Sequence, residues 1–260
     1  MRFLPPVISL FFFVSCASQT VNHSIESMNE IPPQVSQIRF DNLSQLVGYG
    51  IIEFTWEDDA GAHRQQGDFD FWRNGSQISW RISKLGELIF WFGADASGNW
   101  SFDFTDDISS LRINHSDAFF ADAESALCLM GLSYLPDARP MSMLNDANAK
   151  TIIDKKNRQW EVSFGAGGSS IEEIQMTADD FVVSSKFTGL IAVEKDGRHQ
   201  LYWEKTPKQI DTVSSRNNAK VKIVFAGLST VVSEEPFNLV FDVDKLREIL
   251  APNQVFFGPE

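Results

Sequence analysis

Apolar and polar side chains alternate along much of the chain after Gly50, which is the pattern of β-strands with one covered face. In the clearest segment, Ile52, Phe54 and Trp56 share one face and polar residues lie between them. Asn74-Gly75 separates two such segments and favours a tight hairpin turn. The pattern predicts strands over residues 50–56, 65–72, 77–83, 88–92, 100–104, 111–113, 159–164, 171–177, 181–187, 190–194, 200–204, 221–225 and 237–241.

Two segments have helical character instead. Residues 119–132 place Leu127 and Met130 on an apolar stripe, and Asp122 lies where a carboxylate suits a helix N-terminus. A shorter closing helix is predicted over residues 244–250. Because the first helix interrupts the strands and precedes a long loop rich in Pro, Asn and Asp, we expect it to cover the sheet as a lid.

The predicted fold class is mainly β: an incomplete antiparallel β-barrel, formed by a curved meander sheet, with inserted lid helices. The chain contains 22 Phe and 7 Trp against 3 Tyr, and the strands carry many of these rings on one face. Alternation alone does not distinguish a face that lines a cavity from one that packs as a filled core. The candidates for a ligand cavity are Phe54, Trp56, Phe69, Phe71, Trp80, Ile82, Phe90, Phe102 and Phe104, with Leu127 and Met130 from the lid.

The first sixteen residues have the order of an export signal that ends in a cysteine. Arg2 precedes an apolar run that is shorter than the roughly 20 residues a membrane-spanning helix needs. Val14-Ser15-Cys16 resembles the bacterial lipobox, and this resemblance implies cleavage before Cys16 and a diacylglyceryl and palmitate anchor on it. Cys128 then has no disulfide partner and is expected to pack as a small apolar residue. The predicted organisation is a signal peptide over 1–15, a lipidated tether over 16–35 and one domain over 36–260.

The order of motifs along the domain resembles the LolA/LolB family of bacterial lipoprotein carriers. The resemblance rests on Gly48-Tyr-Gly50, the 66–72 hairpin, Ile82-Ser-Lys-Leu-Gly86, the 90–95 strand and the strands near the C-terminus, and extends over residues 40–241. It implies an incomplete barrel with lid helices over a hydrophobic cavity. LolB-like receptors also present an exposed leucine on a loop between early strands. The Asp58-Asp-Ala-Gly-Ala-His63 turn offers no clear counterpart of it.

Composition and spacing argue against several other classes. A formal net charge of −13 leaves no basic patch for nucleic acid. The four histidines are scattered without metal-ligand spacing, so no metal or cofactor is expected. Asp68 and Asp70 share a strand face at about 6.5–7 Å, within the separation a glycosidase needs. A secreted glycoside hydrolase therefore stays as one alternative, although no Gly-x-Ser-x-Gly elbow or other catalytic motif is present.

Together these features predict a non-enzymatic lipoprotein of the bacterial envelope. We expect a monomer, anchored through Cys16 in the outer membrane and facing the periplasm, that holds acyl chains or lipidated proteins in an apolar cavity. The main alternative is an envelope-assembly or sensor protein, which has a filled core and binds its partner on the acidic exterior of the sheet.

Overall fold

One large β-sheet organises the protein. The computed structural model describes residues 44–58, 61–95, 97–114, 122–133, 149–154, 156–165, 171–178, 181–195, 198–200, 206–215, 218–230 and 238–258. The strands are β1 (Gln45–Asp58), β2 (Gly61–Asn74), β3 (Gln77–Lys84), β4 (Glu87–Ala94), β5 (Asn99–Asp103), β6 (Ser110–Ile113), β7 (Ala149–Ile153), β8 (Gln159–Phe164), β9 (Ile171–Ala178), β10 (Phe181–Leu190), β11 (Val193–Lys195), β12 (Arg198–Gln200), β13 (Pro207–Ser214), β14 (Lys220–Ser229) and β15 (Gln254–Phe257). The described helices are α2 (Ala123–Leu129) and α4 (Val243–Leu250), and neither is long and apolar enough to cross a membrane.

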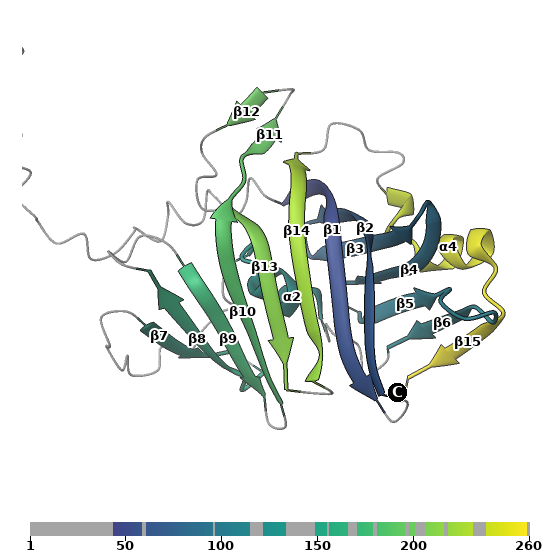
Figure 1. Ribbon diagram of the computed structural model, residues 1–260, viewed down its shortest axis with the longest axis horizontal. Helices are drawn as coiled ribbons and strands as arrows, with labels where there is room; N and C mark the ends of the chain where they lie inside the picture. The colour runs from purple at the N-terminus through teal and green to yellow at the C-terminus, as the bar shows by residue number, and fades with distance from the viewer. Residues whose placement is uncertain are drawn as a thin grey trace, which may run out of the picture.

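The sheet is curved and does not close. Its strand order is β15-β6-β5-β4-β3-β2-β1-β14-β13-β10-β9-β8-β7, with β11 and β12 forming a short hairpin off β14 (Figure 1). Along this path every neighbouring pair is antiparallel except β15 and β6. Along this path of described strands, β7 and β15 are the edges. The predicted mainly β fold with an incomplete antiparallel barrel is therefore confirmed.

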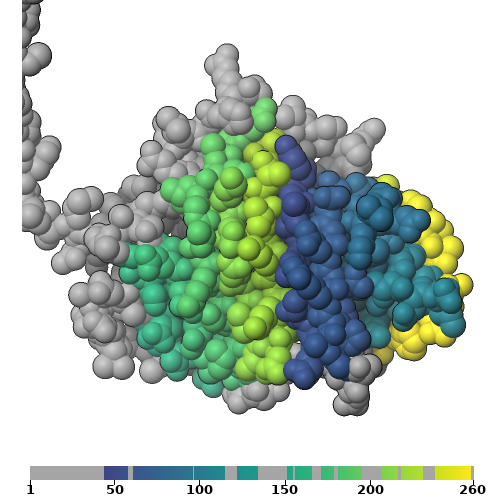
Figure 2. Space-filling view, viewed as in Figure 1, coloured from purple at the N-terminus to yellow at the C-terminus, as the bar shows by residue number. Residues whose placement is uncertain are grey.

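The two halves of the sheet meet where β1 pairs with β14, strands that are far apart in the sequence. Figure 2 shows this line of contact, with β14 in yellow-green against β1 in purple and blue. The register of the pair shifts between Tyr49 and Gly50. A Cβ on Gly50 would lie 2.0 Å from the carbonyl oxygen of Val224. Only glycine therefore allows the two backbones to approach closely at this bulge.

The inner face of the sheet, defined here as the face that α2 covers, carries the largest hydrophobic core. In Figure 1 the helix lies behind β13 and β14. Its Leu127 and Met130 are buried in a cluster with side chains of β1, β2, β3 and β14. Cys128 belongs to a neighbouring cluster with Trp160 of β8. Burial raises the pKa of the Cys128 thiol above its ordinary value, so it stays protonated and packs as an apolar side chain.

Polar contacts hold α2 at both ends. At its N-terminus Asp122 accepts a hydrogen bond from the backbone N–H of Ser125 (2.8 Å), as the sequence predicts for a capping carboxylate. Asp122 also forms an ion pair with Arg158 (2.9 Å). Beyond its C-terminus the carbonyl oxygen of Leu132 accepts a bond from Arg73 of β2 (2.7 Å). Burial lowers the pKa of Arg73 to about 10. Both halves of the sheet therefore contribute an arginine that positions the helix.

A second core lies on the outer face, the face opposite α2, over strands β4 to β6. Leu246 of α4 and Val240 pack there against Trp91, Trp100 and other side chains of β4 to β6. Residues 238–241 form a helical turn and a turn rather than the predicted strand over 237–241, of which residue 237 lies outside the described residues. Because α4 covers the outer face and the inner core covers the other, β4 is apolar on both sides.

Several elements depart from the predicted boundaries. The closing helix is confirmed within one residue, whereas the helix predicted over 119–132 is seen as 123–129, with residues 119–121 outside the described ones. Strands β7, β13 and β15 were not predicted. They are short, or they carry polar and proline residues that weaken the period-2 signal.

Candidate functional site

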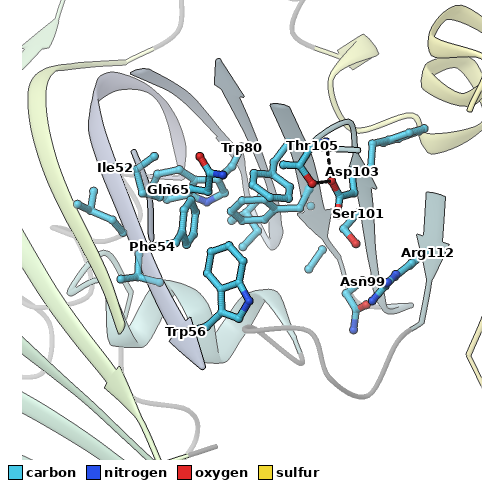
Figure 3. A pocket seen from close by; sticks show the side chains of 18 of the residues that line it. Ile52, Phe54, Trp56, Gln65, Trp80, Asn99, Ser101, Asp103, Thr105 and Arg112 are labelled. Atoms are coloured by element: carbon cyan, nitrogen blue, oxygen red, sulfur yellow. Dashed lines mark hydrogen bonds between the residues drawn. The ribbon is translucent and has the colours of Figure 1, made fainter. Parts of the chain in front are cut away.

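A cavity of about 710 Å³ opens on the inner face of the sheet over β1 to β6 (Figure 3). This volume lies in the usual range of ligand sites, about 300–1,000 Å³. The residues that line it are Ile52, Phe54, Trp56, His63, Gln65, Ile78, Trp80, Phe90, Phe92, Gly93, Ala94, Asn99, Ser101, Phe102, Asp103, Thr105, Asp106, Arg112, Val221 and Ile223.

One wall of the cavity is apolar and aromatic. It comes from the inner-face positions of β1, β3, β4 and β14, which in β1, β3 and β14 alternate with mostly polar residues on the outer face. Phe54 and Phe90 meet edge to face, with ring centroids 6.1 Å apart. At the end of β1 and β2, Trp56 stacks on His63 with centroids 5.0 Å apart. These rings form a largely nonpolar surface against which a hydrocarbon chain can pack.

The opposite wall is polar, and the sheet register explains why. Phe92 of β4 is paired with Ser101 of β5, and Ser101 is paired with Arg112 of β6. Directly paired residues share a face of a sheet, so Ser101 and Arg112 lie on the inner face with Phe92. Figure 3 shows Asn99, Ser101, Asp103, Thr105 and Arg112 grouped on one side of the cavity, across from Ile52 and Phe54.

The charged groups of the polar wall differ in their pairing. One carboxylate oxygen of Asp103 accepts hydrogen bonds from the backbone N–H (2.9 Å) and the hydroxyl (2.6 Å) of Thr105. Arg112 is exposed, and no carboxylate of the described chain lies within 4.0 Å of it. Arg112 is also the one lysine or arginine among the residues that line the cavity.

The predicted cavity residues divide between the cavity and the two cores. Five of them lie along its wall: Phe54, Trp56, Trp80, Phe90 and Phe102. Phe69, Phe71 and Ile82 are buried in the inner core, together with the predicted lid residues Leu127 and Met130.

The strand over 100–104 presents its aromatic rings to the other side of the sheet. Phe102 is paired with Trp91, on the face opposite Phe92, and its ring is fully buried in the outer core. Phe104 stacks on Phe102 in that same core, with ring centroids 6.3 Å apart. Phe104 is therefore not at the cavity, and Phe102 lines it although its ring packs in the outer core. Asp103, between the two, also lines the cavity. The sequence shows which residues of this strand share a face. It does not show that Phe102 and Phe104 lie on the face opposite Phe92 of β4.

Other candidate groups lie away from the cavity or outside the described residues. Cys16 and the predicted signal and tether belong to residues 1–43, which are outside the described part. Asp68 and Asp70 lie on the outer face, where Asp70 accepts two hydrogen bonds from Arg81. They do not face a cleft together, as a glycosidase requires. In the described residues no three His, Cys, Asp or Glu side chains are grouped to hold a metal ion.

An exposed leucine stands at the turn between β3 and β4. Leu85 is 97% exposed and has a φ of 54°, and Gly86 has a φ of 86°. Two consecutive positive φ values are typical of type I′ hairpin turns, which favour Asn or Asp rather than leucine at the first position. The turn over residues 58–63 contains no leucine, and the exposed leucine lies on this later turn.

The comparisons with known proteins found similar structures but no similar sequence. No protein-family model matches the chain, and no curated protein matches its sequence significantly. Similar solved structures include a LolA superfamily protein from Nitrosomonas europaea, with a TM-score of 0.47 and 10% identity over 80% of this chain and 98% of that one.

Two further structures show a comparable likeness. A DUF1329 family protein from Desulfovibrio piger has a TM-score of 0.48 and 12% identity over 82% of this chain and 96% of that one. A putative outer membrane lipoprotein-sorting protein domain from Vibrio parahaemolyticus has a TM-score of 0.41 and 8% identity over 84% and 97%.

Proposed function

We propose that the protein binds acyl chains, of a lipid or of a lipidated protein, in the cavity over β1 to β6. The observation that carries this proposal is the two-sided lining: an aromatic and aliphatic wall faces a wall of polar side chains across about 710 Å³. A hydrocarbon chain gains about 0.8 kcal/mol per CH₂ group that leaves water. Binding of this kind needs an apolar concavity and no reactive group, and the sequence resemblance to LolA/LolB carriers points to the same ligand class.

The cavity also separates this proposal from the filled-core alternative. A sensor or assembly protein that binds on its outer face has no need of a space lined by Phe54, Phe90 and Phe92. These rings are only partly buried, whereas Phe71 and Trp80 beneath them are fully buried. The inner face thus has a packed floor with a second, accessible layer of rings above it.

Replacing Phe54 with aspartate is expected to lower the affinity for a fluorescent fatty acid at least tenfold. Phe54 lines the cavity, and a carboxylate there removes ring contacts and must be desolvated when the chain binds. The matched control is Thr55→Asp on the same strand. Thr55 is paired with Arg64 and Lys220 on the outer face, where an added carboxylate meets two cations. Titrations of both variants, with circular dichroism to establish folding, measure the effect.

Native mass spectrometry of the purified protein supplies an independent measurement. We expect lipid or fatty acid to copurify with the wild-type protein. A wild-type protein that is free of lipid and also takes up no fluorescent fatty acid would contradict the proposed function.

We further propose that the protein is a lipoprotein of the bacterial envelope, held at the outer membrane by Cys16 and facing the periplasm. Its proposed partners are acyl chains or lipidated proteins, and we propose no enzymatic activity. The support is the signal-like segment over 1–15 and its Val14-Ser15-Cys16 ending. The mass of the amino-terminal peptide of the mature protein tests this anchor, since lipidation adds the acyl groups to Cys16. An unmodified cysteine in the membrane fraction would contradict it.

Leu85 fits a contact with the membrane surface, and its replacement with asparagine should have two opposite effects. Asparagine tolerates the left-handed conformation, so we expect the free energy of unfolding to rise by about 1 kcal/mol. Loss of the exposed isobutyl group should weaken cosedimentation with phosphatidylethanolamine and phosphatidylglycerol vesicles. Ile249→Asn is the matched control, because Ile249 is also exposed but lies on α4. Equal loss of vesicle binding in both variants would argue against a specific role of this turn.

A further inference from the structure

We propose that Arg112 forms an anion-binding subsite at the polar end of the cavity. The ligand would then be an amphiphile whose head carries negatively charged oxygens, as in a carboxylate or a phosphate ester. This inference rests on the proposed acyl-chain binding, because the same cavity must accept the apolar part of the ligand. The inference adds that the head of the ligand is anionic and that this head lies at the Arg112 end of the cavity.

A straight row of inner-face residues leads from the aromatic wall to Arg112. Trp80 of β3 is paired with Phe92 of β4, and Phe92 is paired with Ser101 of β5. Ser101 is in turn paired with Arg112 of β6. Neighbouring strands lie about 4.8 Å apart, so the row spans about 14 Å. Along it the surface changes from aromatic through a hydroxyl to a guanidinium, which matches a ligand with an apolar tail and a charged head.

The guanidinium of Arg112 is available to a ligand. Arg112 is exposed, and within the described part of the chain no acidic side chain pairs with it. Elsewhere in the sheet, exposed arginines are paired: Arg64 with Glu53 (2.8 Å) and Arg81 with Asp70 (2.5 Å). A guanidinium presents parallel N–H donors that match the oxygens of a carboxylate or a phosphate.

The neighbouring polar groups favour an anion at Arg112 rather than farther along β5. Ser101 presents a hydroxyl beside it, and Asn99 lies on the same side of the cavity (Figure 3). Asp103 is two residues beyond Ser101, about 6.5–7 Å along the strand, and Asp106 follows on the same wall. These carboxylates repel an anion at their end of the wall. The charge pattern therefore places the head next to Arg112.

Isothermal titration calorimetry with two ligands of equal chain length tests this subsite. Dodecanoate carries the anionic head and dodecanol carries a neutral one. We expect the wild-type protein to bind dodecanoate about five- to tenfold more tightly than dodecanol, the size of effect that a partly exposed charged hydrogen bond supports. In Arg112→Gln this preference should fall to near unity, and Arg112→Lys should retain part of it. Arg64→Gln is the control, because it removes an exposed arginine from the outer face.

Each remaining outcome bears on a different claim. Equal affinity of the wild-type protein for both ligands, unchanged in Arg112→Gln, overturns the subsite but leaves acyl-chain binding intact. Failure of the wild-type protein to bind either ligand overturns the proposed function itself, and the subsite with it. Displacement of dodecanoate by millimolar inorganic phosphate would show that Arg112 takes free anions, and this overturns the assignment to the head of an amphiphile.

Discussion

Replacing Asp154 with alanine should lower the free energy of unfolding by about 3–5 kcal/mol, the range found when one partner of a buried ion pair is removed. Asp154 is only 2% exposed. One of its oxygens accepts hydrogen bonds from Arg158 Nε (2.7 Å) and Trp160 Nε1 (2.9 Å). The other accepts from the backbone N–H groups of Lys156 (2.8 Å) and Arg158 (2.9 Å). Alanine leaves four donors without their acceptor, and the bond from Trp160 among them is buried.

Urea unfolding followed by tryptophan fluorescence measures this loss, and Lys156→Ala is the matched control. The Lys156 ammonium pairs with Asp122 at 3.0 Å but is 56% exposed, so its removal should cost less than about 1 kcal/mol. Similar losses in the two variants would show that burial does not strengthen the Asp154 contacts.

The same group of contacts predicts how stability depends on pH. Burial opposes ionisation of Asp122, but hydrogen bonds from Ser125 and Lys156 and the charge of Arg158 outweigh it and lower its pKa to about 2. Burial also opposes ionisation of Asp154, and bonds from Trp160 and Arg158 again lower the pKa. A carboxyl with a lowered folded-state pKa stabilises the fold above its ordinary pKa near 4 and loses this contribution as pH falls. Wild type should therefore lose stability between about pH 4 and 2, and Asp154→Ala should lose less.

Trp80→Ala should also destabilise the protein by about 3–5 kcal/mol, the usual cost of truncating a buried aromatic side chain. Trp80 is 0% exposed and forms part of the cavity floor. Its ring lies 4.9 Å from Phe69, 4.6 Å from Phe71 and 6.1 Å from Phe92, measured between centroids. Removing the indole therefore leaves a void at the centre of the inner core. Chemical unfolding measures the loss.

Trp80→Phe separates the packing of this side chain from its polar atom. The buried Nε1 of Trp80 has no hydrogen-bond partner among the described residues, and a buried donor without an acceptor costs roughly 1–3 kcal/mol. Phenylalanine removes this cost while it gives up part of the ring contacts. We therefore expect a net change within about 1 kcal/mol. A loss as large as that of alanine would show that the indole nitrogen has an acceptor in solution.

Much of the sheet could be predicted from local sequence. The alternation of Ile52, Phe54 and Trp56 placed a strand, and in the structure all three lie on the inner face and line the cavity. The hairpin turn after Asn74 was predicted from turn chemistry, and Gly75 has the expected positive φ of 58°. Such features depend on neighbours a few residues away, so a short stretch of chain specifies them.

The polar wall of the cavity could not be predicted, because strand alternation leaves one question open. Period 2 shows which residues of a strand share a face, but not which face of the sheet that is. The run over residues 88–92 is apolar on both sides, so the sequence does not show which of its residues face inward. As a result the rings of Phe102 and Phe104 were assigned to the inner face, and Ser101 and Arg112 were overlooked. The register of β4, β5 and β6 settles their placement.

Leu85 illustrates a second limit. Its motif, Ile82-Ser-Lys-Leu-Gly86, was visible in the sequence, but the exposure of the leucine depends on the hairpin that lifts it out of the sheet. The proposed lipid anchor at Cys16 shows the opposite situation, in which only the sequence carries information. It rests entirely on a local motif, and the described residues do not include it.

The amino-acid sequence therefore specified the β class, most strands, the capping of α2 and the closing helix, because propensity, period and turn residues act over short distances. The pairing of β1 with β14 and the covering of the outer face by α4 were decided by contacts between distant segments. So was the arrangement of Arg112 across from the aromatic wall. Such contacts depend on register and packing in three dimensions, which a pattern along one strand does not encode.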